Sequence, residues 1–133
     1  MRIMLDTNVL ISMILFRSKS FTNLFSHIME NHTLVLSTFV ISELKAVAEK
    51  KFPDKTGMID RFLSALACEI VYTPDDIDYS LFKIRDINDY PVLYTAILAN
   101  VDIFITGDKD FIDIDVEHPE ILTPSQFIEH YCS

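Results

Sequence analysis

Residues 3–8 read Ile-Met-Leu-Asp-Thr-Asn, a short apolar run that ends at the carboxylate of Asp6. The residues from Val9 to Leu15 are nearly all apolar, and this run is too long and continuous for a strand. The segment therefore predicts a strand, a turn at Asp6 and a helix. In open parallel α/β sheets, ligands bind in the crevice outside the carboxyl ends of the strands. We therefore expect Asp6 to lie at a binding crevice.

The alternation of short apolar runs with amphipathic segments continues along the chain. The apolar runs predict further strands at residues 34–36, 70–72, 102–106 and 121–122. Apolar residues three and four positions apart predict helices at residues 21–29, 38–52, 59–67, 77–84, 89–98 and from residue 124 onward. Strands that alternate with helices imply right-handed βαβ units. We expect the α/β class, with a doubly wound fold of three layers (α/β/α) whose middle layer is a parallel sheet of about four to five strands.

The length and composition indicate one ordinary globular domain. The chain has 133 residues, of which 50% are hydrophobic, and no linker or repeat divides it. A chain of this size buries enough surface to fold without disulfides or structural metals. Cys68 and Cys132 have no ligand spacing, and Asp6 interrupts the N-terminal apolar run too early for a signal peptide. We expect a single domain over residues 1–133 that is cytoplasmic and has no membrane partner.

The charge balance bears on nucleic-acid binding. The net charge is -9, with 20 acidic residues against 11 basic residues, whereas phosphate binding normally depends on Lys and Arg. Seven basic residues fall into two groups: Lys45, Lys50, Lys51, Lys55 and Arg61 in one, and Arg17 and Lys19 in the other. These residues form either a local basic face or merely the solvated side of helices, and both interpretations stay open.

Four acidic residues occupy comparable places in the predicted fold. Asp6 follows the first strand, and Glu43 lies about one turn into the helix after the second strand. Asp89 opens the helix before the fourth strand, and Asp108 follows that strand. Because the carboxyl ends of parallel strands meet at one edge of the sheet, at least three of these acids are expected to lie together.

Clustered carboxylates repel one another and raise each other's pKa unless a positive charge lies between them. A divalent cation such as Mg²⁺ or Mn²⁺ supplies that charge, takes oxygen ligands, and can activate water and stabilise a transferring phosphate. Taken singly, each acid could instead have a purely structural role. Asp6 and Asp89 could cap helices. Asp108 could be a turn residue, and Glu43 could be a solvated helix residue.

Other kinds of site find little support. The four histidines have no i, i+4 pairing and no cysteine companion, so a zinc site is not expected. The only glycines are Gly57 and Gly107, so the chain has no glycine-rich phosphate loop.

With these residues in view, the sequence resembles a PIN domain over nearly its whole length. The resemblance is carried by four segments in order: Met4–Asn8, Ser42–Leu44, Arg85–Leu93 and Ile105–Phe111. The subgroup it most resembles is the set of prokaryotic PIN proteins identified as toxins of toxin-antitoxin pairs, similar to VapC toxins.

The resemblance implies an endoribonuclease that depends on Mg²⁺ or Mn²⁺. Asp6, Glu43, Asp89 and Asp108 match the acids that bind metal and help position the attacking water, and cleavage leaves a 5′-phosphate and a 3′-hydroxyl. The resemblance also implies a homodimer and a small antitoxin protein that covers the site.

Further polar residues match positions near that site in the family. Asn8 and Thr106 match polar residues beside the acids. Asp110 matches a position that supplements or replaces the preceding acid, so the fourth metal ligand is either Asp108 or Asp110. Asp86 is a further carboxylate close by in the sequence.

Two alternatives to the ribonuclease are compatible with the predicted fold. The first is a PIN-like subunit that has lost activity and binds a partner or RNA, which the presence of all four acids disfavours. The second is an aspartate-based phosphotransfer domain. Asp6-Thr7-Asn8 lacks the second aspartate of the phosphatase pattern, and Asp54 follows a helix and not a strand, unlike a receiver phosphoacceptor.

Overall fold

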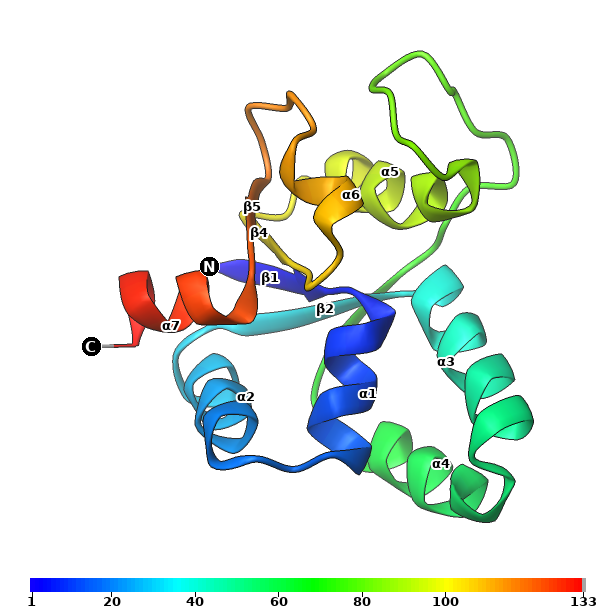
Figure 1. Cartoon of the computed structure of the whole chain (residues 1–133), viewed down its shortest axis with the longest axis vertical. Helices are drawn as coiled ribbons and strands as arrows, with labels where there is room; N and C mark the ends of the chain where they lie inside the picture. The colour runs from blue at the N-terminus through cyan, green and yellow to red at the C-terminus, as the bar shows by residue number, and fades with distance from the viewer. Residues whose placement is uncertain (133) are drawn as a thin grey trace.

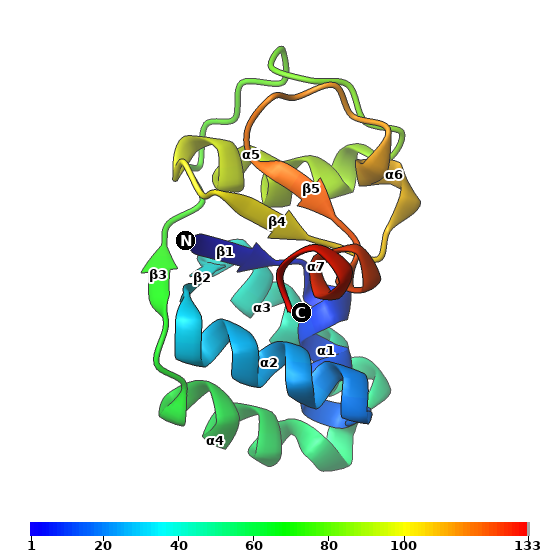
Figure 2. The same cartoon turned by 90° about the vertical axis from the view of Figure 1, so that its left-hand side faces the viewer.

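A five-stranded, wholly parallel sheet forms the centre of the molecule, seen here in a computed structural model that describes residues 1–132. The strand order across the sheet is β3-β2-β1-β4-β5. The strands are β1 (Arg2–Leu5), β2 (Thr33–Ser37), β3 (Glu69–Val71), β4 (Ile103–Ile105) and β5 (Glu120–Leu122). In Figure 2, β4 lies between β1 and β5.

Helices cover both faces of this sheet. The α-helices are α1 (Thr7–Leu15), α2 (Lys19–Asn31), α3 (Thr38–Lys51), α4 (Thr56–Ala65), α5 (Tyr90–Leu98), α6 (Lys109–Ile112) and α7 (Pro124–Tyr131). Two short 3-10 helices, η1 (Pro53–Lys55) and η2 (Ile87–Asp89), precede α4 and α5. Figure 1 shows α5 and α6 above the sheet and the other α-helices below it. The predicted three-layer α/β/α architecture with a parallel sheet is confirmed.

The central strand β1 is apolar because it is buried on both faces. Ile3, Met4 and Leu5 are fully buried, and β1 pairs with β2 on one side and β4 on the other. A strand covered by helices on both sides has no solvated face and needs no alternation of polar residues. The first apolar run of the chain is therefore the middle of the sheet.

The side of the sheet to which the chain adds strands changes at β1. From β1 the chain adds β2 and β3 on one side of the sheet and then returns to add β4 and β5 on the other. Leu5 pairs in register with Ile105, and the Asp6 amide donates to the Ile105 carbonyl at 2.9 Å. The carboxyl ends of β1 and β4 therefore flank the switch point, where open α/β sheets form their binding crevice.

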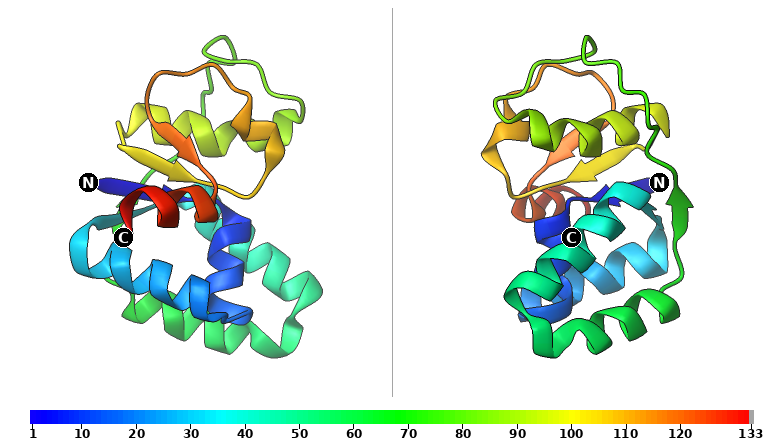
Figure 3. Two further views of the ribbon diagram at one scale, coloured as in Figure 1. Left: turned by 60° about the vertical axis from the view of Figure 1, so that its left-hand side comes forward. Right: turned by 90° about the vertical axis from the view of Figure 1, so that its right-hand side faces the viewer.

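The structure corrects two local expectations. The predicted helix at residues 77–84 is wrong, because residues 72–86 form an irregular segment that joins β3 to η2 over one end of the molecule (Figure 3). Residues 109–112 form the short helix α6, where only a turn was expected after Gly107. The other predicted helices and strands are confirmed with shifts of a few residues at their ends.

Tyr90 explains why residues 77–84 do not form a helix. Its ring is buried and stacks on Phe82 with centroids 4.0 Å apart. Its hydroxyl donates to the Asp78 carbonyl at 2.6 Å and accepts from the Leu81 amide at 3.2 Å. A tertiary partner thus satisfies backbone groups that a helix would otherwise have to pair.

Two further features concern the cysteines and the apolar character of the helices. Cys68 and Cys132 are both free thiols. None of the helices within residues 1–132 combines the length and apolar character that crossing a bilayer requires.

Replacing Tyr90 by Phe tests this anchor. The substitution Tyr90→Phe keeps the ring but removes the hydroxyl, which leaves the Asp78 carbonyl and the Leu81 amide without this partner. The free energy of unfolding should fall by about 1–2 kcal/mol in urea denaturation. Tyr79→Phe is the matched control, since Tyr79 is 54% exposed and its change should cost less than about 0.5 kcal/mol. Equal stabilities of the two variants would contradict the anchoring role.

Candidate functional site

Asp6 lies at the centre of the site and is almost fully buried, with 6% of its surface exposed. It is the N-cap residue of α1, and its Oδ1 accepts a hydrogen bond from the Thr7 amide at 2.8 Å. Its Oδ2 accepts from the Thr106 hydroxyl at 2.8 Å. Burial raises the pKa of Asp6, and the charges of Glu43 and Asp108 also raise it, whereas the two hydrogen bonds act in the opposite direction.

Thr106 links the ends of β1 and β4. It follows β4 directly, is fully buried, and donates to Asp6 while its hydroxyl accepts from the Asp108 amide at 3.0 Å. One hydroxyl therefore orients the Asp6 carboxylate and the start of the turn that carries Asp108. The family resemblance predicted Thr106 near the site, and these two bonds give its role there.

Glu43 approaches the site from α3. The buried hydroxyl of Thr7 donates to Glu43 Oε1 at 2.5 Å, which connects the first turn of α1 to α3. Glu43 is partly buried at this point and its charge acts on Asp6. Thr7 is a bridging residue that the sequence analysis missed. Its position directly after Asp6 was the available signal, but its partner comes from a different helix.

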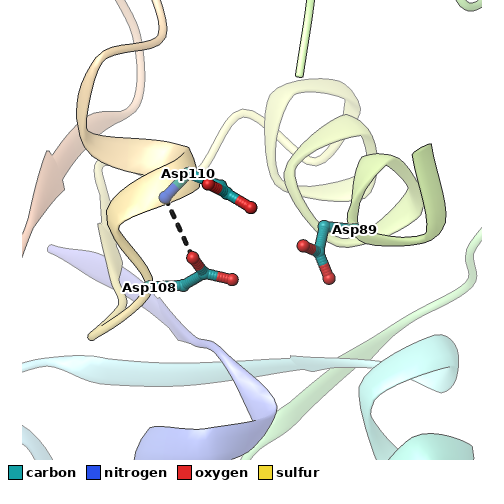
Figure 4. Close-up of side chains that lie close together, drawn as sticks. All are labelled: Asp89, Asp108 and Asp110. Atoms are coloured by element: carbon teal, nitrogen blue, oxygen red, sulfur yellow. Dashed lines mark hydrogen bonds between the residues drawn. The ribbon is translucent and has the colours of Figure 1, made fainter. Parts of the chain in front are cut away.

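Asp89, Asp108 and Asp110 form a tight acidic cluster. One carboxylate oxygen from each lies within 4.8 Å of the other two, and all three side chains are partly buried. Figure 4 shows them facing the space between α6 and the start of α5. The Asp110 amide donates to Asp108 Oδ1 at 2.9 Å. This hydrogen bond does not neutralise the charge of Asp108, and it does not involve the Asp89 carboxylate.

The electrostatics of Asp89 reflect this crowding. Desolvation by burial and then the charge of Asp108 raise the pKa of Asp89 to about 6, with smaller effects of Asp86, Asp6 and Glu43 in the same direction. Asp89 occupies the N-cap position of α5, yet its side chain accepts no capping hydrogen bond. Helix capping therefore accounts for Asp6 and Asp108, which do accept such bonds, but does not account for Asp89.

The residues present fit a hard divalent cation. The cluster offers only carboxylate oxygens, it is partly open to solvent, and burial together with the charge of Asp108 raises the pKa of Asp89. The nearest basic group is Arg85, whose Nη1 lies 3.8 Å from Asp110 Oδ1. The Arg85 side chain is 88% exposed, so it screens the cluster weakly.

The remaining predicted residues are placed less centrally. Asn8 is exposed on the first turn of α1, and its side chain forms no hydrogen bond within residues 1–132. Asp86 accepts from the Asn88 amide and caps η2. Both Asp108 and Asp110 lie beside Asp89, so their positions alone do not choose between them as the fourth ligand.

The comparisons with known proteins agree with this architecture. A sequence model of the PIN domain matches residues 2–110. Among solved structures, the chain is similar to a chain in the crystal structure of VapBC2 from Rickettsia felis bound to a DNA fragment from their promoter. The identity is 24% and the TM-score 0.67, over 92% of this chain and 97% of that chain, which shows a shared fold. No curated protein has a matching sequence.

The raised pKa of Asp89 predicts how pH affects the stability of the metal-free protein. Between its ordinary value of 3.8 and about 6, the folded chain binds this proton more tightly than the unfolded chain does. The contribution of Asp89 to stability is therefore most favourable below pH 4 and declines as the pH rises through 6.

Asp89→Asn removes this dependence. In buffer with a chelator, the variant should be more stable than the parent at pH 7, and the difference should shrink as the pH falls toward 4. Urea denaturation across this range measures the difference. Asp115→Asn, which changes an exposed carboxylate outside the cluster, should leave the parent's pH profile in place. A difference between Asp89→Asn and the parent that did not vary with pH would contradict the assignment.

Proposed function

This chain belongs to the PIN-domain family, and on that basis we propose that it is an endoribonuclease that uses Mg²⁺ or Mn²⁺. The observation that carries the proposal is the cluster of Asp89, Asp108 and Asp110 beside the buried Asp6, at the switch point of the sheet. Four acids from three separate parts of the chain meet there at a cost in repulsion. A resident cation offsets that cost.

Asp89, Asp108 and Asp110 are the residues that would hold the cation, and the buried Asp6 lies beside them. A divalent cation bound there supplies positive charge that stabilises the transferring phosphate and makes water a better nucleophile. Asp6 is held by the Thr7 amide and the Thr106 hydroxyl, so its carboxylate keeps one orientation. Prior orientation of this kind lowers the cost of organising the site during the reaction.

Asp108 is the stronger candidate for the fourth ligand. Its charge acts on both Asp6 and Asp89, and it is the largest charge effect on Asp89. Asp110 already has the Arg85 guanidinium 3.8 Å away. We therefore assign Asp108 as the ligand and Asp110 as a supplementary one.

Glu43 is suited to handle the proton of the attacking water. Thr7 holds its Oε1, while Oε2 forms no hydrogen bond within residues 1–132. The water oxygen forms a bond to phosphorus as the bond to the 3′ oxygen breaks; the water gives a proton to Glu43, and the leaving 3′ oxygen takes a proton from solvent. The products then carry a 5′-phosphate and a 3′-hydroxyl.

We further propose that this nuclease is the toxin of a toxin-antitoxin pair. The structural likeness to a chain in a VapBC complex supports a small antitoxin protein as its partner, and a homodimer belongs to the same proposal.

The described residues pack around one continuous hydrophobic cluster, which supports a single domain over residues 1–133.

Asp6→Asn tests the catalytic proposal. The amide keeps the size of the side chain and one capping oxygen but removes the charge that faces the cluster. Cleavage of single-stranded RNA in Mn²⁺ should fall by roughly two orders of magnitude or more. Circular dichroism and thermal unfolding should show an intact fold. Asp60→Asn, an exposed carboxylate on α4, is the matched control and should retain full activity. Full activity of Asp6→Asn would refute the role of Asp6.

Metal binding can be separated from catalysis by calorimetry. We expect Mn²⁺ to bind the purified chain at neutral pH, and Asp89→Asn and Asp108→Asn each to weaken this affinity by roughly tenfold or more. Asp110→Asn should have a clearly smaller effect. If the parent chain bound no divalent metal, the inactive binding subunit would become the better description. A larger loss for Asp110→Asn than for Asp108→Asn would exchange their assigned roles.

A further inference from the structure

A groove of about 320 Å³ adjoins the acidic cluster and shares Asp110 with it. Its walls come from the irregular segment before η2 and from α6 with the residues that follow it. We call it the basic groove, and it is lined by Lys83, Ile84, Arg85, Lys109, Asp110, Asp113 and Ile114. Three basic residues from two separate segments therefore meet beside the proposed metal site.

Three basic and two acidic residues line this groove, in a chain whose net charge is -9. Lys83, Arg85 and Lys109 are all exposed, and the Arg85 side chain is 88% exposed. The single ion pair among them, from Arg85 to Asp110, is long at 3.8 Å and leaves most of the guanidinium donors available. Of the two acids in the lining, Asp110 would be further neutralised by a bound cation.

Another groove is lined by residues close to Glu43 and Asp89 in the sequence. It is lined by Thr38, Phe39, Ser42, Thr73, Pro74, Asp75, Ile77 and Pro91, with no basic residue among them. Ser42 precedes Glu43, and Pro91 lies two residues after Asp89. This groove therefore offers no cation to a nucleic-acid strand, in contrast to the basic groove.

The basic residues singled out in the sequence analysis lie elsewhere. Lys45 lines a pocket between α3 and α4 together with Glu49 and Asp60, so acids accompany it. Lys50, Lys51 and Lys55 lie at the far end of α3 and in η1, and Figure 1 shows this region remote from α5 and α6. These residues offer a set of equal charge away from the site.

We propose that the basic groove binds the phosphate groups of the RNA strand next to the scissile phosphate. This inference rests on the proposed ribonuclease function. A cluster of carboxylates repels a polyanionic strand, and cations that bind the flanking phosphates offset this repulsion and set the position of the strand. Ile84 and Ile114 add apolar surface to the same lining. Lys83, Arg85 and Lys109 are therefore positioning residues for the substrate.

The test compares two triple variants of the full chain, each losing three positive charges. K83Q/R85Q/K109Q removes the cations of the basic groove, and K50Q/K51Q/K55Q is the matched control. Both are placed in the Asp6→Asn background to prevent cleavage, and binding of a short fluorescein-labelled single-stranded RNA is followed by anisotropy at several NaCl concentrations. The single variants Lys83→Gln and Lys109→Gln are measured as well, so that the result does not depend on the folding of one triple variant.

We expect the groove variant to bind roughly tenfold more weakly at low salt, with each single variant showing part of this loss. The slope of log affinity against log salt should fall in magnitude by about 0.7 for each phosphate contact removed, or about 2 in all. The control should stay within about twofold of the parent. Equal losses in both triple variants, or unchanged binding in the groove variant, would overturn the proposal.

The two proposals fail in different ways. If the parent chain cleaves RNA and the groove variant binds RNA as tightly as the control variant does, the basic groove is wrong and the nuclease stands. If the parent chain never cleaves RNA, yet the groove variant binds RNA more weakly than the control variant does, the nuclease is wrong and the groove is supported. Absence of any RNA binding by the parent chain would refute the groove.

Discussion

The carboxylate of Asp6, held between the Thr7 amide and the Thr106 hydroxyl, is the interaction around which the site is organised. It joins the end of β1, the first turn of α1 and the end of β4, three parts of the chain that meet only because β1 lies in the middle of the sheet. From Thr7 the connection continues to Glu43 on α3, and from Thr106 it continues to Asp108. Buried polar groups need hydrogen-bond partners, so the bonds that orient the site also stabilise the fold.

The distribution of charge follows from this arrangement. Asp89, Asp108 and Asp110 are brought within 4.8 Å of one another, and burial together with repulsion raises the pKa of Asp89 to about 6. The fold accepts this local cost because packing and strand pairing elsewhere hold the elements in place. A site of this kind attracts a divalent cation but repels a nucleic acid. The three basic residues of the basic groove lie where that second effect needs to be offset.

The sequence pattern predicted the architecture, and it predicted acids at strand ends through one rule, that polar residues after parallel strands gather at one edge. Asp6 and Asp108 obey it directly, since each follows its strand and caps the next helix. Local pattern failed at residues 77–84, where the spacing of Ile77, Leu81 and Ile84 resembles a helix but the buried Tyr90 binds the backbone instead. It also failed at α6, whose four residues are too few for a periodicity to emerge.

The sequence by itself determined the order of the strands and of the longer helices, the apolar character of β1 and the presence of acids at strand ends, because apolar periodicity and strand termini are local properties of the chain. Only the tertiary structure decided which oxygen bonds which hydroxyl, that Asp89 stands free of a capping role, and that Lys83 and Arg85 meet Lys109. Those contacts join residues far apart in sequence, and their geometry depends on how α3, α5 and α6 pack against the sheet. No local pattern encodes that packing, since it is set by the whole core at once.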